Sequence, residues 1–319
     1  MPNDPLLYET PLPIRRTLFP LGFPATIVTN CERIVVTAEE LWGRFERTCD
    51  EPPIEIRLAV SESPVSGRPT PTKPRGQGHL VSTVHDASNF LVSDLRSGFG
   101  FGWLTPAVAC DGPYVRYHFL EPHVMMLLQS RHFTPLHAGC VVLRGKGLLL
   151  CGDSEAGKTT LSYACARKGW TYVSDDGLRL IRKSSARVVV GNPYQVRFRP
   201  PAKLLFPELS GYVPFERPNG KPSLELDTAL LNLAIAEQAH ADYLVFLNRK
   251  SSGGQRLVEY DREEALAQLE QAICFGEESL RQEQRESLRR LLSAPVYEMK
   301  YYDLDWAEQR LRALVENGE

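Results

Sequence analysis

Short segments rich in apolar and β-branched residues, separated by turn residues, fill the first part of this chain, as is typical of β-strands. They cover residues 26–28, 33–37, 54–60, 80–84, 90–93, 100–104 and 115–119. One helical stripe follows at residues 122–132, where Val124, Leu127 and Leu128 share a face. The pattern predicts a smaller, mostly β N-terminal domain over residues 1–130.

Residues 61–78 interrupt this pattern. The stretch has almost no apolar content and carries Pro64, Pro69, Pro71 and Pro74. Such a segment buries too little surface to fix its own conformation. It is predicted to be a flexible, proline-rich loop.

Strand and helix patterns alternate over residues 131–319. Two apolar segments, 139–143 and 147–151, flank Arg144-Gly145-Lys146 and predict a hairpin. Further strands are expected at 171–174, 178–181, 188–190, 195–198, 243–247 and 296–301, and helices at 228–238, 263–275, 278–292 and 305–315. This mixture predicts an α/β fold in which the larger second domain is built on a mixed sheet.

A phosphate-binding pattern lies between strand and helix signals in the second part. Residues 152–159 read Gly-Asp-Ser-Glu-Ala-Gly-Lys-Thr and fill every fixed position of G-x-x-x-x-G-K-[ST]. The apolar run 148–151 precedes the pattern, and an apolar helical stripe follows the lysine. A plain glycine turn would also join a strand to a helix, but this context favours a nucleotide site. The expected nucleotide-binding residues are Gly152, Asp153, Ser154, Glu155, Ala156, Gly157, Lys158, Thr159 and Thr160.

The chemistry expected of this loop is that of a magnesium–nucleotide complex. Glycines let the backbone turn sharply and present successive N–H groups to phosphate oxygens. Lys158 adds positive charge at the outer phosphates, and Thr159 offers a hydroxyl to Mg²⁺. The helix that starts there directs its positive dipole end at the same anion. ATP and Mg²⁺ are therefore the predicted cofactors. Lys158 is also a candidate catalytic residue, because its position in the loop brings its charge to the outer phosphates.

Length, charge and cysteine content limit the classes of protein to which this chain can belong. The chain has 319 residues, of which 43% are hydrophobic, and a formal net charge of -2. It is long enough for two domains, and its charge argues against binding nucleic acid through bulk electrostatics. Seven cysteines without a C-x-x-C pair suit reduced thiols. No signal-peptide or membrane-span pattern occurs, so we expect a cytoplasmic protein without a membrane partner. A homo-oligomer is compatible with the sequence.

Two adjacent carboxylates follow the apolar strand pattern at 170–173. Asp175 and Asp176 precede Gly177, and Asp-Asp-Gly is also ordinary turn chemistry. Beside a phosphate loop, one carboxylate can hold Mg²⁺ while the other accepts a proton from an attacking hydroxyl. In this setting the functional interpretation is the stronger one, with Asp175 and Asp176 as candidates for base and metal ligand.

Two other side-chain types are ambiguous by themselves. His137 lies among leucine and alanine, which is more typical of a structural histidine. Basic residues are dense between 179 and 203, and Arg197 and Arg199 would share one strand face. Such residues often only protect a sheet edge from unwanted pairing. Arg197 is the one for which contact with phosphate or an anionic acceptor is favoured.

Taken in order, three segments resemble a known family. Leu136-His137-Ala138-Gly139, the loop from Gly152 to Thr159, and Ser174-Asp175-Asp176 are similar to the C-terminal catalytic domain of the HPr kinase/phosphorylase family. The resemblance runs from about residue 135 to the C-terminus. It implies that Lys158 and Thr159 handle phosphates and Mg²⁺, that Asp175 is the base toward a serine-type hydroxyl, that Asp176 is a metal-side carboxylate and that His137 is an active-site neighbour of that pair. Arg197 matches the arginine of the family's signature, and in a kinase it would stabilise the charge of the transferring phosphoryl group.

The chain also departs from that family. Glu155 stands where the family usually has glycine, and Gln195 stands where the resemblance implies a metal-binding glutamate. We therefore expect an ATP- and Mg²⁺-dependent kinase for a serine-type hydroxyl on free serine, a peptide or a protein. Because of these departures, recognition of the HPr protein and the family's reverse reaction, phosphorolysis, are not expected to carry over. A non-catalytic ATP sensor and a phosphoserine phosphatase or phosphorylase remain alternatives.

Overall fold

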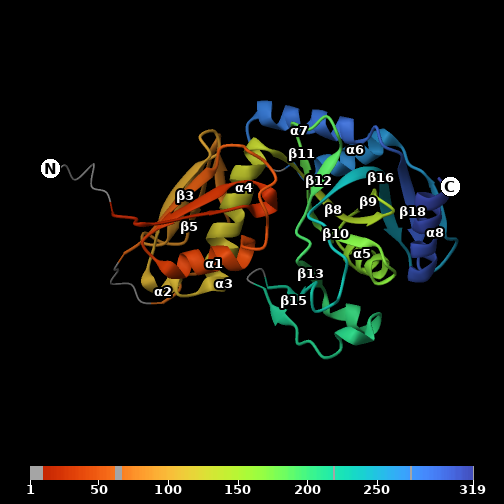
Figure 1. The fold of residues 1–319 in the computed structure, drawn as a ribbon, viewed down its shortest axis with the longest axis horizontal. Helices are drawn as coiled ribbons and strands as arrows, with labels where there is room; N and C mark the ends of the chain where they lie inside the picture. The colour runs from red at the N-terminus through yellow and green to blue at the C-terminus, as the bar shows by residue number, and fades with distance from the viewer. Residues whose placement is uncertain (1–9, 62–66, 218–219, 274, 319) are drawn as a thin grey trace. The chain divides into compact units, whose positions relative to one another are not determined.

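The computed structural model describes residues 10–61, 67–217, 220–273 and 275–318. The chain divides into two compact units, both visible in Figure 1. Met1–Arg131 with Phe275–Glu277 form the first unit, and His132–Cys274 with Glu278–Glu319 form the second. Both contain sheets and helices, which confirms the predicted α/β class and the mixed sheet of the second domain. The first unit, predicted to be mostly β, contains helices as well as strands. Among the described residues no helix is both long and apolar enough to cross a membrane.

The first unit is built on a seven-stranded sheet in the order β1-β2-β3-β7-β6-β5-β4. Its strands are β1 (Ile14–Leu18), β2 (Ala25–Thr29), β3 (Ile54–Val60), β4 (Arg75–Gln77), β5 (Leu80–Val84), β6 (Phe90–Asp94) and β7 (Phe99–Leu104). The β2–β3 and β3–β7 pairs are parallel and the others antiparallel. The helical segments are a 3-10 turn (Pro20–Gly22), α1 (Glu32–Trp42), α2 (Pro106–Ala109), α3 (Gly112–Val115), a π-helical turn (Arg116–Leu120) and α4 (Glu121–Arg131).

Two strand predictions in this unit are wrong. Residues 33–37 belong to α1, because Ile34, Ala38 and Trp42 repeat at helical spacing and are buried, although the β-branched run suggested a strand. Residues 115–119 lie at the end of α3 and in the π-helical turn. In the proline-rich stretch, Arg75–Gln77 forms edge strand β4 rather than a loop, and residues 62–66, with Pro64, lie outside the described residues.

The second unit contains an eight-stranded mixed sheet. Along one path the order is β10-β8-β11-β12-β16-β18-β17, and β9 pairs with both β8 and β16. The bounds are β8 (Phe133–Leu143), β9 (Lys146–Cys151), β10 (Thr171–Ser174), β11 (Gly177–Ile181), β12 (Val188–Val190), β16 (Gln238–Arg249), β17 (Arg256–Glu259) and β18 (Val296–Tyr301). The predicted hairpin through Arg144 and Gly145 is confirmed, since β8 and β9 pair antiparallel.

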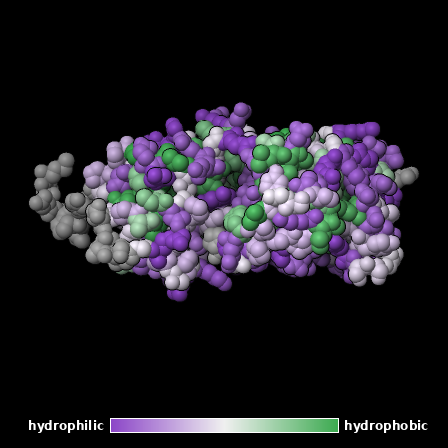
Figure 2. All heavy atoms as spheres, turned by 90° about the horizontal axis from the view of Figure 1, so that it is seen from below, coloured by the Kyte–Doolittle hydropathy of each residue, from purple (hydrophilic) through white to green (hydrophobic). Residues whose placement is uncertain are grey.

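Helices cover both faces of this sheet (Figure 1). Leu149 and Cys151 of β9 pack toward α6 (Arg262–Glu270) and α7 (Glu278–Leu291). The alternate residues Leu148 and Leu150 pack toward α5 (Lys158–Arg167) and α8 (Leu304–Asn317). β9 is buried on both faces, which explains its unbroken apolar sequence. Figure 2 shows one face of the molecule, where hydrophobic side chains form separate patches among hydrophilic ones.

A small three-stranded sheet packs against α5. It has the order β13-β15-β14, formed by β13 (Gln195–Phe198), β14 (Phe215–Glu216) and β15 (Pro222–Asp227). Two short 3-10 helices, Pro200–Leu204 and Pro207–Leu209, join β13 to β14. Val196 and Phe198 of β13 are buried, so Gln195 and Arg197 lie on the opposite face of the strand.

The predicted helix over residues 228–238 is wrong. Turns and a bridge at Ile235 occupy this segment, and β16 begins at Gln238. Asn232 has a φ of 49°, a left-handed conformation that ends a helix, and Leu230 is 69% exposed. The predicted helix at 263–275 ends at Glu270 in the structure, and Cys274 lies outside the described residues.

Candidate functional site

The phosphate-binding pattern forms a tight loop between β9 and α5. Gly152, Glu155 and Gly157 have φ values of 142°, 73° and 100°. At Gly157 a Cβ atom would lie 2.3 Å from the hydroxyl oxygen of Tyr301, and that hydroxyl donates a hydrogen bond to the Ala156 carbonyl at 3.1 Å. Glycine is therefore required at position 157 by both conformation and space. Tyr301, at the end of β18, holds the loop in place.

The start of α5 presents unsatisfied donors. For the backbone N–H groups from Gly157 to Thr160, the described residues provide no hydrogen-bond acceptor. These are the four donors that every helix leaves without an internal partner, and they carry the positive end of the helix dipole. Thr159 and Thr160 are half-buried in this first turn. The arrangement suits an anion such as phosphate.

Lys158 is folded onto the loop. Its residue is 5% exposed, and its Nζ donates to the carbonyls of Gly152 at 2.8 Å and Asp153 at 2.9 Å. The same nitrogen lies 3.4 Å from Oδ1 of Asp176. The ammonium is thus fixed at the loop and linked to one of the two adjacent carboxylates.

His137 and Asp176 meet across two paired strands. His137 of β8 is in register with Gly177 of β11, and this register places its Nδ1 3.2 Å from Oδ1 of Asp176. Partial burial lowers the pKa of His137, and the neighbouring Asp176 offsets this only in part. The histidine therefore favours its neutral form at neutral pH, with Asp176 shared between it and Lys158.

Asp175 has a different environment from Asp176. It is 6% exposed, and its Oδ2 accepts the backbone N–H of Arg197 at 3.1 Å. Burial raises the pKa of Asp175, and the charge of Asp176 raises it further, although the Arg197 N–H and a side-chain hydrogen bond with Thr159 favour the ionised form. Burial thus disfavours the charged form of Asp175, which is the behaviour expected of a carboxyl group that acts as a base.

The polar face of β13 runs toward the loop. Arg199, which directly follows β13 in extended conformation, donates to Oε1 of Glu155 at 2.5 Å and to Oγ of Ser154 at 3.2 Å. The carboxylate of Glu155 is thereby paired with a cation. The predicted common face of Arg197 and Arg199 brings both arginines to the site side of the small sheet.

Gln195 is engaged within the small sheet. Its Nε2 donates to Oε2 of Glu225 at 2.7 Å, and its Oε1 accepts from Nε of Arg197 at 3.1 Å. Glu225 has a side chain only 6% exposed, and its Oε1 lies 3.4 Å from Nε of both Arg197 and Arg217. The amide of Gln195 therefore belongs to a network centred on the Glu225 carboxylate.

The predicted residues that cluster are the loop, Lys158, Thr159, His137, Asp175, Asp176 and the backbone of Arg197. Among residues that the sequence interpretation missed, Tyr301 touches the loop, and Glu225 and Arg217 touch Arg197. The pairing of Arg197 with Glu225 across β13 and β15 would have revealed Glu225, but β15 was not predicted. No sequence pattern near Tyr301 indicated its contact with the loop. That contact arises because β9 and β18 both pair in parallel with β16.

The donor set at this site fits Mg²⁺ held together with nucleotide phosphates. Mg²⁺ prefers hard oxygen ligands and keeps several waters. Thr159 offers a hydroxyl, and Asp176 offers a carboxylate whose side chain is 52% exposed. Within the described ranges no group of three or more His, Cys, Asp or Glu side chains could hold a metal by itself. A cation here would thus take its remaining ligands from water or phosphate oxygens.

Comparison with protein-family models gives no match, and comparison with curated proteins gives none either. Among solved structures, the chain is similar to the Hpr(Ser) kinase/phosphatase from Coxiella burnetii, at 15% identity and a TM-score of 0.33. The match covers 58% of this chain and 95% of that chain. At these values the relationship is distant and says nothing about activity.

Proposed function

We propose that the second unit is an ATP- and Mg²⁺-dependent kinase that transfers the γ-phosphoryl group to a serine-type hydroxyl. The observation that carries this proposal is the position of Asp175, a buried carboxylate that accepts the backbone N–H of Arg197 at 3.1 Å and directly precedes Asp176, whose Oδ1 lies 3.4 Å from Nζ of Lys158. Burial raises the pKa of Asp175. Phosphate binding alone needs the loop and Lys158, but it does not need a base.

In the proposed reaction Asp175 accepts the proton of the acceptor hydroxyl. The hydroxyl oxygen forms a new bond to the γ-phosphorus while the bond from that phosphorus to the β–γ bridging oxygen breaks, and ADP leaves. A carboxyl group whose pKa is raised by burial is a stronger base than an exposed one, and such groups supply roughly 10²–10⁴-fold of rate. The acceptor hydroxyl would be free serine, a peptide or a protein.

The loop and the cations around it carry the phosphate charge. The N–H groups of Gly157 to Thr160 and the Lys158 ammonium are fixed before binding, so no reorganisation is needed when charge develops on the transferring group. Arg197 adds a guanidinium beside Asp175. Bound Mg²⁺ neutralises phosphate charge, and Thr159 and Asp176 are the residues that would hold it. Such a reaction belongs in the cytoplasm, where ATP is available.

The test separates the kinase from the alternatives. The purified full-length chain is incubated with γ-labelled ATP and Mg²⁺ in the presence of serine, serine peptides and cell extract. We expect label in an acceptor hydroxyl and loss of that label in Asp175→Asn. ATP binding without transfer to any acceptor would favour the sensor, and release of phosphate from phosphoserine without use of ATP would favour the phosphatase.

A further inference from the structure

A second arginine lies beside Arg197. Arg217, at the end of β14, contacts the same Glu225 carboxylate oxygen at the same distance of 3.4 Å through its own Nε. Gln195 donates to the other oxygen at 2.7 Å. Three side chains from two separate segments therefore converge on one carboxylate.

The burial of these groups is uneven. The Glu225 side chain is 6% exposed, whereas those of Arg197 and Arg217 are 29% and 25% exposed. The carboxylate lies inside and the guanidinium groups reach solvent. Two guanidinium groups thus share the Glu225 carboxylate at this surface. Guanidinium groups fixed by a buried carboxylate suit the binding of carboxylate or phosphate, because their planar donors are already oriented.

The strand geometry sets where this arginine pair lies relative to the phosphate loop. Arg199 touches Ser154 and Glu155 of the loop, and Arg197 precedes it by two residues on the same face. Residues two apart on a strand are separated by about 7 Å. Arg197 therefore lies farther from the loop than Arg199 does. It lies close to Asp175, because its backbone N–H donates to the Asp175 carboxylate.

We propose that Arg197 and Arg217, oriented by Glu225, bind an anionic group that the acceptor carries close to its hydroxyl. This rests on the proposed transfer to a hydroxyl acceptor and narrows its class. The acceptor is a hydroxyl compound with its own carboxylate or phosphate, such as a hydroxy acid or the carboxylate of free serine. A neutral polyol lacks the group that the arginine pair recognises.

The probe is inorganic phosphate, titrated by calorimetry into the full-length chain in the presence of Mg²⁺ and a saturating non-hydrolysable ATP analogue. The analogue fills the loop and the γ-phosphate position. We expect phosphate still to bind, Arg217→Gln to weaken it about tenfold or more, and Arg217→Lys to recover part of the loss. Arg256→Gln, the same change on β17, is the matched control and should leave phosphate affinity unchanged.

Equal phosphate affinity in Arg217→Gln and wild type would overturn the proposal, as would displacement of phosphate by the analogue. A purely structural role of Arg217 would lower the melting temperature without changing phosphate affinity in the folded protein. Phosphate is also titrated into Lys158→Ala without nucleotide. In this variant the phosphate loop is weakened and no ATP is present, so the result does not depend on whether the protein is a kinase. Arg217-dependent phosphate binding there supports the arginine pair even if ATP transfer is never found.

Discussion

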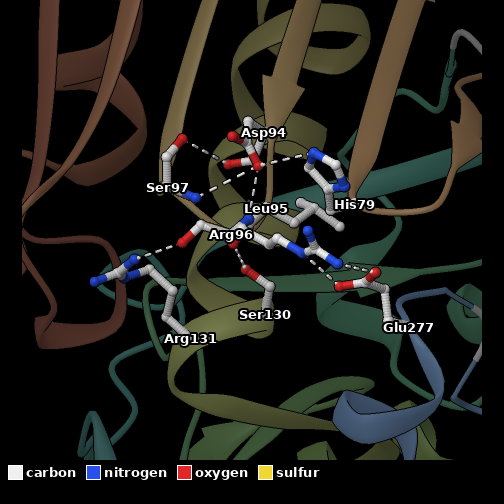
Figure 3. Close-up of polar contacts among 8 residues, drawn as sticks. All are labelled: His79, Asp94, Leu95, Arg96, Ser97, Ser130, Arg131 and Glu277. Carbon is white, nitrogen blue, oxygen red and sulfur yellow. Dashed lines mark hydrogen bonds and ion pairs between the residues drawn. The ribbon is translucent and has the colours of Figure 1, made fainter.

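Two aspartate-containing turns, one in each unit, show how turn chemistry differs from a candidate site. Asp94 ends β6, and its Oδ1 accepts the N–H groups of Arg96 at 2.9 Å and Ser97 at 3.4 Å within its own turn (Figure 3). Asp175 follows β10, but its carboxylate accepts the N–H of Arg197, which is 22 residues away. The first carboxylate stabilises its turn, whereas the second joins distant elements.

The pKa values of the two carboxyl groups are shifted in opposite directions. Although burial opposes it, the N–H groups of Arg96 and Ser97 hold the pKa of Asp94 below its usual value. The Asp94 turn is braced by Arg131, which donates to the Arg96 carbonyl at 3.3 Å, and by the bidentate Arg96–Glu277 pair at 2.6 and 2.8 Å (Figure 3). Burial raises the pKa of Asp175 instead. A carboxylate kept where its charge is disfavoured marks a functional candidate.

The largest expected effect is on phosphoryl transfer. Asp175→Asn should lower the transfer rate by roughly 10²–10⁴-fold, because the amide cannot accept the hydroxyl proton. Asp94→Asn, the same change in the other turn, should leave the rate within about twofold. Rates with saturating labelled ATP check both variants. Equal losses in the two variants would mean that the two turns do not differ in function.

The next effect is on nucleotide affinity. Lys158→Ala should weaken ATP binding by about 2–3 kcal/mol, or roughly 30–150-fold, since a charge-assisted contact to phosphate is lost. Lys146→Ala, at the opposite end of β9, removes a lysine whose Nζ lies 3.4 Å from the Val315 carbonyl and should not change ATP affinity. Calorimetric titration of ATP into each variant gives the comparison. An unaltered dissociation constant in Lys158→Ala would remove the phosphate site.

Gln195→Glu tests a charge beside Arg197. The family resemblance implies a metal-binding glutamate at this position, but Gln195 donates to Glu225 at 2.7 Å, so a second carboxylate would face the first. We expect a loss of about 1–3 kcal/mol in unfolding free energy at pH 7, which shrinks at acid pH as the pair takes up a proton. Urea denaturation at both pH values measures it. Restoration of stability by Mg²⁺ would show that the two carboxylates hold the cation, and no loss at either pH would contradict the contact.

The smallest effects concern stability and have opposite signs in the two turns. Because the pKa of Asp175 is raised in the folded state, wild type loses stability as pH rises from the usual aspartate pKa through the raised value. Asp175→Asn should therefore be more stable than wild type at neutral pH and equal to it in acid.

Asp94 has a lowered folded pKa, so its contribution is present above the usual aspartate pKa and is lost as pH falls through the folded value. Asp94→Asn should thus be slightly less stable than wild type at neutral pH, with the difference vanishing in acid. Melting curves from pH 3 to pH 8 follow both differences. Differences of the same sign would refute the contrast between the turns.

The sequence predicted local features of the second unit well and long-range contacts poorly. The β8–β9 hairpin and the strand, loop and helix around residues 147–167 could be predicted because turn residues and apolar runs lie close together in sequence. The strand predicted at 33–37 failed because burial of Ile34, Ala38 and Trp42 on one helix face outweighed β-propensity.

The partners of the site residues were harder to predict. Glu225 meets Arg197 only through the β13–β15 pairing, and Tyr301 reaches the loop only through the order of strands in the main sheet. Neither arrangement has a local signature. Asp175 could be proposed from its position after a strand, but its burial and its distant N–H donor come only from the assembled fold.

The most direct test is the titration of the two carboxyl groups, followed by carbon-13 NMR of the aspartate side chains and assigned with Asp175→Asn and Asp94→Asn. We predict a pKa above the usual aspartate value for Asp175 and below it for Asp94, with only the Asp175 signal shifting when Mg²⁺ and a non-hydrolysable ATP analogue bind. If Asp175 titrates like Asp94 and does not respond to the nucleotide, it is a turn residue, and the proposed base is wrong.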